Sequence, residues 1–244
     1  MENKIIFLVT LIFILIVIKI YNIKNKQNIK ERFTNIDYMV ITLGNMDRLK
    51  NISEQQNKNN INIQLINAVN GISLSQDDLI KNNTMDNKFK ELTSKRNNEI
   101  GCYLSHLKIY KTILDSGIID GVTVIFEDDF IINIDNITQS INTIISELNN
   151  IDFDIIYLGN TFGAIGVQFK HNIYYADKIN KILGTFGYLI NNKSAKKIYN
   201  LMNYIDMQVD EKINNLIKES KLNAFVIKPN IVNHNYELKS TILV

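Results

Sequence analysis

Val122-Thr-Val-Ile-Phe-Glu-Asp-Asp-Phe130 is an apolar run that leads directly into three consecutive carboxylates. The run from Val122 to Phe126 predicts a buried β-strand, because β-branched and aromatic residues pack well on a pleated surface. Three ionised carboxylates side by side repel one another, and burying one of them without a partner is costly. The stretch therefore indicates either a cation held at the end of a strand or a solvated acidic turn.

The spacing of these acids suits a bound cation. In an extended backbone Glu127 and Asp129 project to the same side, while Asp128 projects to the other. Such a pair can grip one divalent ion, and oxygen ligands favour Mg²⁺ or Mn²⁺, which keep coordination positions open for the oxygens of a diphosphate. We therefore predict a divalent-cation site that includes Glu127 and Asp129.

Around this stretch, short apolar segments alternate with amphipathic ones, which predicts an α/β domain. The expected strands are 38–43, 63–69, 122–126, 153–158, 187–190 and 224–227. The expected helices are 48–58, 99–116, 137–149, 195–203 and 211–220. Residues 77–98 are polar, without Gly or Pro, and are expected to form either a loop or frayed helical turns. We expect a single domain over residues 36–240.

The charge distribution argues against a nucleic-acid partner. Of the 27 basic and 25 acidic residues, six basic and two acidic ones fall within residues 1–32. The rest of the chain therefore holds 21 basic and 23 acidic residues, a net charge of −2. It has no basic stripe of the kind that neutralises phosphates along a nucleic acid.

The N-terminus contains an apolar run from Ile5 to Ile18 that is broken only by Thr10. The run extends to Tyr21 if Lys19 places its ammonium at the headgroups. No small-residue cleavage site follows Ile20, so we expect a retained signal-anchor, a transmembrane helix over residues 1–21, rather than a cleaved signal. This predicts a single-pass membrane protein with a polar linker over 22–35, and leaves open which side of the membrane the domain faces.

A second motif, Asn98-Glu-Ile-Gly-Cys-Tyr-Leu-Ser-His-Leu107, falls on an expected helix. Glu99, Cys102 or Tyr103, and His106 share one face of that helix and can line a cleft together. The alternative is a partly buried His106 that is hydrogen-bonded to its neighbours. Because Cys102 is the one cysteine of the chain, a Cys-based zinc site is not expected.

Two further polar residues follow expected elements near the C-terminus. Asp210 precedes the helix over 211–220, where it can act as the N-cap or, at the edge of an α/β sheet, as a base. His234 comes just after the last expected strand and is either a site residue or a surface histidine.

Taken in order, the motifs resemble glycosyltransferase family 25, which holds bacterial lipooligosaccharide galactosyltransferases and collagen galactosyltransferase domains. The matching blocks are Met39-Val-Ile-Thr-Leu43 with Asp47-Arg48, Ala68-Val-Asn-Gly71, Glu99 to His106, Phe126-Glu-Asp-Asp129, Asp154 to Gly159, Gly184-Thr-Phe-Gly-Tyr188, Ser194-Ala-Lys-Lys197, Val209-Asp210 and Pro229 to Val232. Each block is weak alone, but the ordered set covers nearly the whole domain.

The resemblance implies a GT-A fold with a mixed central sheet, a UDP-sugar donor, and Mn²⁺ or Mg²⁺ at an Asp-X-Asp-type motif. It implies inverting transfer of a hexose, galactose or glucose, to a glycan, lipid-linked or protein acceptor, as in lipopolysaccharide biosynthesis. The roles expected from the motifs and the resemblance are metal ligands at Glu127, Asp129 and His234, donor contacts at Asp128, Thr42, Arg48 and His106, and catalysis by Asp210, the base, and Glu99.

Two other functions remain open on the sequence alone. One is a degenerate sugar-nucleotide or glycan-binding protein that keeps the fold without turnover. The other is a metal-dependent phosphodiesterase built on the same carboxylates, although the sequence shows no second acidic or His-rich cluster.

Overall fold

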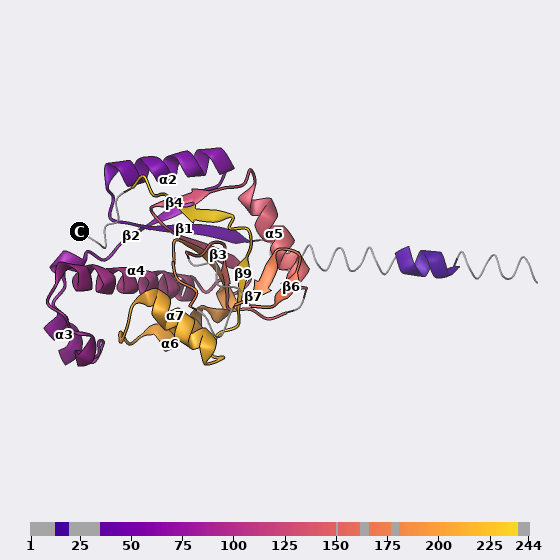
Figure 1. The fold of residues 1–244 in the computed structure, drawn as a ribbon. Helices are drawn as coiled ribbons and strands as arrows, with labels where there is room; N and C mark the ends of the chain where they lie inside the picture. The colour runs from indigo at the N-terminus through magenta and orange to yellow at the C-terminus, as the bar shows by residue number, and fades with distance from the viewer. Residues whose placement is uncertain (1–12, 20–34, 150, 162–165, 177–180, 239–244) are drawn as a thin grey trace, which may run out of the picture. The chain divides into compact units, whose positions relative to one another are not determined.

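The computed structural model describes residues 13–19, 35–149, 151–161, 166–176 and 181–238 (Figure 1). The chain divides into two compact units, residues 1–34 and residues 35–244, and each is described by itself.

In the N-terminal unit, residues 13–19 form a helix. No helix among the described residues is long and apolar enough to cross a membrane. This finding overturns the expected transmembrane helix over 1–21 and the single-pass membrane localisation drawn from it. The other residues of that segment, and nearly all of the expected linker over 22–35, lie outside the described part of the chain.

The second unit is built on an eight-stranded mixed sheet in the order β2-β1-β3-β8-β5-β9-β7-β6. A separate antiparallel pair joins β10 to β4. The strands are β1 (Ile36–Thr42), β2 (Ile63–Asn67), β3 (Val122–Glu127), β4 (Phe130–Ile132), β5 (Ile155–Tyr157), β6 (Gln168–Lys170), β7 (Ile173–Tyr175), β8 (Gly187–Asn191), β9 (Ala224–Ile227) and β10 (Val232–His234). The mixed α/β sheet is the expected one.

Helices cover both faces of this sheet, with α4, α6 and α7 on one face and α2 and α5 on the other (Figure 1). The helices are α2 (Met46–Asn59), α3 (Gln76–Lys81), α4 (Ser94–Ser116), α5 (Ile137–Leu148), α6 (Ala195–Met202) and α7 (Val209–Lys218). Successive side chains of β1 point to opposite faces of the sheet, so β1 contacts the helices on both sides. Met39 belongs to the core on the side of α4, and the Tyr38 hydroxyl hydrogen-bonds Thr138 of α5 at 2.8 Å.

The register of the three parallel strands defines one edge of the sheet. β1 lies between β2 and β3, and Ile41 of β1 is opposite Glu127 of β3. The carboxyl ends of β1 and β3 therefore coincide, which brings Thr42 next to the start of the acidic turn. In open α/β sheets ligands bind at this end of the strands.

All six expected strands and all five expected helices are present, with ends shifted by a few residues. The polar segment 77–98 holds α3, a 3₁₀ turn over Asn87–Phe89 and the start of α4, which begins at Ser94 behind the cap Thr93. The sequence did not predict β4, β6, β7 and β10, because each is only three residues long and shows no clear alternation.

Two glycines allow α4 to approach the loop after β2. A Cβ on Gly101 would lie 2.7 Å from the Val69 carbonyl oxygen and 2.9 Å from the Gly71 nitrogen. A Cβ on Gly71 would collide with the Asn97 carbonyl. Glycine is therefore required at both positions for α4 to pack this closely on the loop. This packing positions Cys102 and His106 of α4 relative to the sheet.

Gly101→Ala is therefore expected to lower the free energy of unfolding by about 1–3 kcal/mol, because the added methyl group meets backbone atoms that cannot rotate away. Denaturant titration of the full chain measures this loss. Lys111→Ala, on the exposed side of the same helix, is the control and should leave the stability close to that of the wild type. Equal stability of the two variants would contradict the close packing.

Candidate active site

The three acids lie where β3 ends and turns into β4. Glu127 is the last residue of β3, and Asp128 and Asp129 form the turn. Asn51 of α2 holds this turn, because its side-chain amide donates to the carbonyls of Asp128 at 3.1 Å and Phe130 at 3.0 Å. The expectation of an extended backbone therefore fails after Glu127, and Glu127 has other partners than Asp128 and Asp129.

Arg48 of α2 holds the two acids of the turn. Its NH1 donates to Asp128 Oδ1 and, at 2.9 Å, to Asp129 Oδ2. Burial opposes the charge of Arg48, but the two carboxylates outweigh burial and raise its pKa. Burial raises the pKa of Asp128, against the opposing effects of Arg48 and a hydrogen bond from Thr42. One guanidinium faces two carboxylates, so the turn keeps an excess of negative charge.

His234 reaches Asp129 through the small antiparallel sheet, in which His234 of β10 is opposite Phe130 of β4. Its Nε2 lies 3.1 Å from Asp129 Oδ2. The hydrogen bond to Asp129 raises the pKa of His234 despite burial. Burial also raises the pKa of Asp129, but His234 and Arg48 outweigh it, so that the net pKa is lowered. Asp129 and His234, two of the three predicted metal ligands, are thus in contact with each other.

The donor set at this turn suits a cation. Asp129 Oδ1 and His234 Nδ1 are buried and have no hydrogen-bond partner among the described residues. A buried carboxylate oxygen without a partner is costly, and a divalent ion is one way to satisfy it. The Oδ1 of Asp129, buried and without a partner, is therefore available to a cation such as Mn²⁺ or Mg²⁺.

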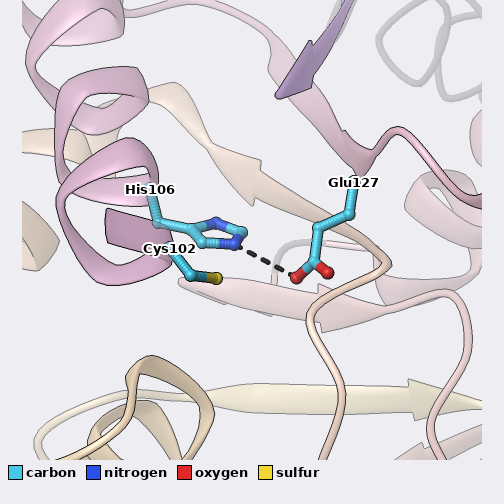
Figure 2. A group of neighbouring side chains, drawn as sticks. All are labelled: Cys102, His106 and Glu127. Carbon is cyan, nitrogen blue, oxygen red and sulfur yellow. Dashed lines mark hydrogen bonds and ion pairs between the residues drawn. The ribbon is translucent and has the colours of Figure 1, made fainter. Parts of the chain in front are cut away.

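Glu127 faces the opposite way, toward α4 and β8. Its Oε1 accepts a hydrogen bond from the Thr185 hydroxyl and lies 3.3 Å from His106 Nε2. The other ring nitrogen of His106 lies 2.8 Å from the Tyr188 hydroxyl. Figure 2 shows Cys102 and His106 on α4 directed toward Glu127. His106 is fully buried and hydrogen-bonded, which agrees with the alternative considered from the sequence, and it also borders the carboxylate.

Asp210 is tied to the same region through two adjacent residues. The Gly184 N–H donates to Asp210 Oδ2 at 3.3 Å, while Thr185 donates to Glu127. Asp210 lies inside the first turn of α7 and the N-cap is Gln208, so the expected N-cap role is wrong. Burial is the main cause that raises the pKa of Asp210, and the charges of Glu127 and Glu211 raise it further.

Glu99 has a different environment from the other predicted residues. It lies in α4 and forms an ion pair with Arg96 at 2.7 Å. Arg96 in turn stacks over the Phe89 ring at 4.0 Å. The ion pair of Glu99 is therefore with a residue near the start of α4 and not with the acidic turn.

Most of the predicted residues meet in one cleft of about 180 Å³ at the carboxyl ends of β1 and β3. Its charged and polar lining is Thr42, Arg48, Asn98, Cys102, Ser105, Glu127, Asp128, Asp129 and His234. Buried carboxylates at this end of a parallel sheet segment, with a cationic side chain beside them, suit a phosphorylated ligand and a metal ion. The fold and the site together define an α/β protein with a carboxylate-lined cleft.

Comparisons with known proteins give the family. Residues 35–213 match the profile described as "Glycosyltransferase family 25 (LPS biosynthesis protein)". The chain belongs to glycosyltransferase family 25.

One similar relative is the Xenopus laevis protein "Procollagen galactosyltransferase 1-A", with 32% identity over 121 residues. The alignment covers 46% of this chain and only 19% of that protein. Among solved structures, "Crystal Structure of A197 from STIV" aligns at a TM-score of 0.40 and 10% identity, over 82% of this chain and 85% of that one.

Several residues of the site were not predicted from the sequence. Asn51 lies one helical turn after Arg48, a spacing that places both on one face of α2 toward the acidic turn. Thr185 and Tyr188 belong to a recognised motif, but nothing in their spacing shows that they contact Glu127 and His106. Such contacts across the sheet arise from β3–β8 pairing, which the sequence does not specify.

Proposed function

We propose that this family 25 protein is a glycosyltransferase that transfers a hexose from a UDP-sugar to a hydroxyl group of a glycan or glycoconjugate, with inversion and with a divalent cation. The observation that carries the proposal is the convergence of Asp128, Asp129, Arg48 and His234 in the cleft at the ends of β1 and β3. Galactose is the first candidate sugar, because the relative found by comparison is named a galactosyltransferase.

The cation would be held by Asp129 and His234, with Glu127 beside them, and is expected to be Mn²⁺ or Mg²⁺. When bound, such an ion neutralises negative charge on the departing diphosphate. Arg48 positions Asp128 and Asp129 by donating to both, so that the carboxylates do not depend on the ion for their orientation. Thr42, at the end of β1, would border the nucleotide.

Asp210 would take the proton from the acceptor hydroxyl as the new glycosidic bond forms. An inverting transfer needs one such base, and Asp210 is held by the N–H groups of Gly184 and Glu211. Burial and the nearby carboxylate Glu127 raise its pKa, which strengthens it as a base. Glu99 was also predicted to be catalytic, but its ion pair with Arg96 gives no support for that role.

A specific observation favours a second candidate function. Because Arg48 already binds both Asp128 and Asp129, the turn is partly neutralised without a cation. This would suit a protein that binds a sugar nucleotide and does not turn it over.

A panel of UDP-sugars tests the proposal. The purified full chain is incubated with each donor, a hexose-terminated oligosaccharide mixture and Mn²⁺, and the products are analysed by mass spectrometry. The proposal expects UDP together with an acceptor that has gained one hexose. Binding of the donor without UDP release would favour the second candidate. Nucleoside monophosphate and sugar phosphate would indicate a phosphodiesterase instead.

A further inference from the structure

Beside the acidic turn, three potential metal ligands of different chemistry come together across the sheet. The Cys102 thiol, a ring nitrogen of His106 and a carboxylate oxygen of Glu127 all lie within 4.8 Å of one another (Figure 2). Cys102 and His106 are four residues apart on α4, and so share one helix face, while Glu127 comes from the end of β3. A Cys-based zinc site was not expected from the sequence because the chain has one cysteine, and the sequence does not show that Glu127 lies beside Cys102 and His106.

The spacing fits tetrahedral coordination. Zinc binds cysteine sulfur at about 2.3 Å and histidine nitrogen or carboxylate oxygen at about 2.0–2.2 Å, so the ligand atoms of a tetrahedral site lie about 3.3–3.8 Å apart. The distance from His106 Nε2 to Glu127 Oε1 is 3.3 Å, long for a charge-assisted hydrogen bond but in that range. The two separations that involve the Cys102 sulfur are at most 4.8 Å, so they would shorten by up to about 1 Å around a bound ion.

The surroundings of His106 also resemble those of a metal ligand. Metal-binding histidines use their second ring nitrogen for a hydrogen bond that fixes the ring. His106 Nδ1 lies 2.8 Å from the Tyr188 hydroxyl, and that hydroxyl lies 2.7 Å from the hydroxyl of Tyr110. These two buried phenols hold the imidazole with Nε2 directed at Glu127. Thr185 does the same for the carboxylate by donating to Glu127 Oε1.

The charge of the three ligands and their access to solvent also suit a divalent ion. A thiolate and a carboxylate together supply two negative charges, which one divalent ion balances. Cys102 and Glu127 both line the cleft, so an ion can enter from solvent and keep a water as its fourth ligand. Thiolate and imidazole favour Zn²⁺ over Mg²⁺ or Mn²⁺, which prefer oxygen ligands.

We infer that Cys102, His106 and Glu127 form a binding site for a thiophilic divalent cation of the Zn²⁺ type, distinct from the oxygen-rich site proposed at Asp129 and His234. The two sites share the neighbourhood of Glu127, so Zn²⁺ bound to the trio competes for that carboxylate. The inference concerns binding alone and does not depend on which sugar nucleotide the enzyme uses.

Cobalt binding to the full chain, freed of metal by a chelator that is then removed, tests the inference. Co²⁺ is expected to give a thiolate-to-cobalt charge-transfer band that saturates at one equivalent per chain and that Zn²⁺ abolishes. Because Cys102 is the one cysteine of the chain, the band reports on this residue alone. Absence of the band, or a stoichiometry of half an equivalent from two chains sharing an ion, would overturn the inference.

Variants identify the other two ligands. Cys102→Ser should remove the band, and His106→Asn and Glu127→Gln should each weaken Zn²⁺ binding by about tenfold or more in calorimetry. His171→Asn, at an exposed histidine, and Asp129→Asn, in the proposed oxygen-rich site, should leave the band in place. Unchanged Zn²⁺ affinity in both His106→Asn and Glu127→Gln would show that the thiol binds alone and would overturn the site.

A measurement on the wild-type chain covers the case in which a variant fails to fold. Zn²⁺ should protect Cys102 from alkylation by iodoacetamide, whereas Mg²⁺ at the same concentration should not. Equal alkylation rates with and without Zn²⁺ would contradict the inference. None of these readouts uses sugar transfer, so failure of the zinc site and failure of the proposed enzymatic function are separate results.

Discussion

Asp129→Asn is expected to reduce metal-dependent transfer by about 100-fold or more, equivalent to about 2.7 kcal/mol of transition-state stabilisation. The variant loses the charge of the one carboxylate that contacts both Arg48 and His234 and that has a buried oxygen without a partner. Initial rates of UDP release, measured with saturating Mn²⁺, check this result.

Asp135→Asn is the matched control, because Asp135 is an exposed acid six residues further along the chain. It should keep the wild-type rate. Circular dichroism should show that both variants remain folded, since asparagine preserves the shape of the side chain. Full metal-dependent turnover in Asp129→Asn would show that the cation site lies elsewhere.

Asp210→Asn is expected to lower the rate of transfer by about 10²–10⁴-fold, the usual contribution of a general base. Folding should be little affected. Burial raises the folded-state pKa of Asp210 above its value in the unfolded chain, so its ionised form costs stability at neutral pH. Removing the charge is therefore not expected to lower the free energy of unfolding at pH 7 by more than about 1 kcal/mol.

The pH dependence separates a base from a merely structural residue. The carboxylate must be ionised to accept a proton, so the wild-type rate should fall as pH falls through the raised pKa of Asp210. In Asp210→Asn this acidic limb should be absent. The control is Glu211→Gln on the same helical turn, where the side chain pairs with Lys181 instead. If the rate of Asp210→Asn falls over the same acidic pH range as the wild-type rate, Asp210 is not the base.

The sequence predicted the central part of the fold because each long element has a clear hydrophobic period. β3 is a continuous apolar run, and α5 places Ile137, Ile141, Ile144 and Leu148 on one buried face. The short strands β4 and β10 were not predicted, since three residues carry no period, although they are the elements that bring His234 to Asp129. The membrane anchor predicted from the apolar run Ile5 to Ile18 was wrong, because no helix among the described residues is long and apolar enough to cross a membrane.

The candidate site could be predicted as a set of residue types but not as an arrangement. The acidic triplet, Arg48 and His234 were selected from the sequence, and they do line one cleft. Which of these residues contact one another was not predicted. Glu127 contacts His106, whereas Asp128 and Asp129, in the turn that follows, contact Arg48. Side-chain partners across a sheet depend on register and turn geometry, which a local pattern does not encode.

Manganese binding in the presence of UDP tests the central claim most directly. Electron paramagnetic resonance follows the free Mn²⁺ signal as the full chain is added. We expect wild-type protein with UDP to take up one equivalent of Mn²⁺, and Asp129→Asn to bind it at least about tenfold more weakly. Equal uptake by the two proteins, or no uptake by the wild type, would contradict a catalytic cation at the end of β3.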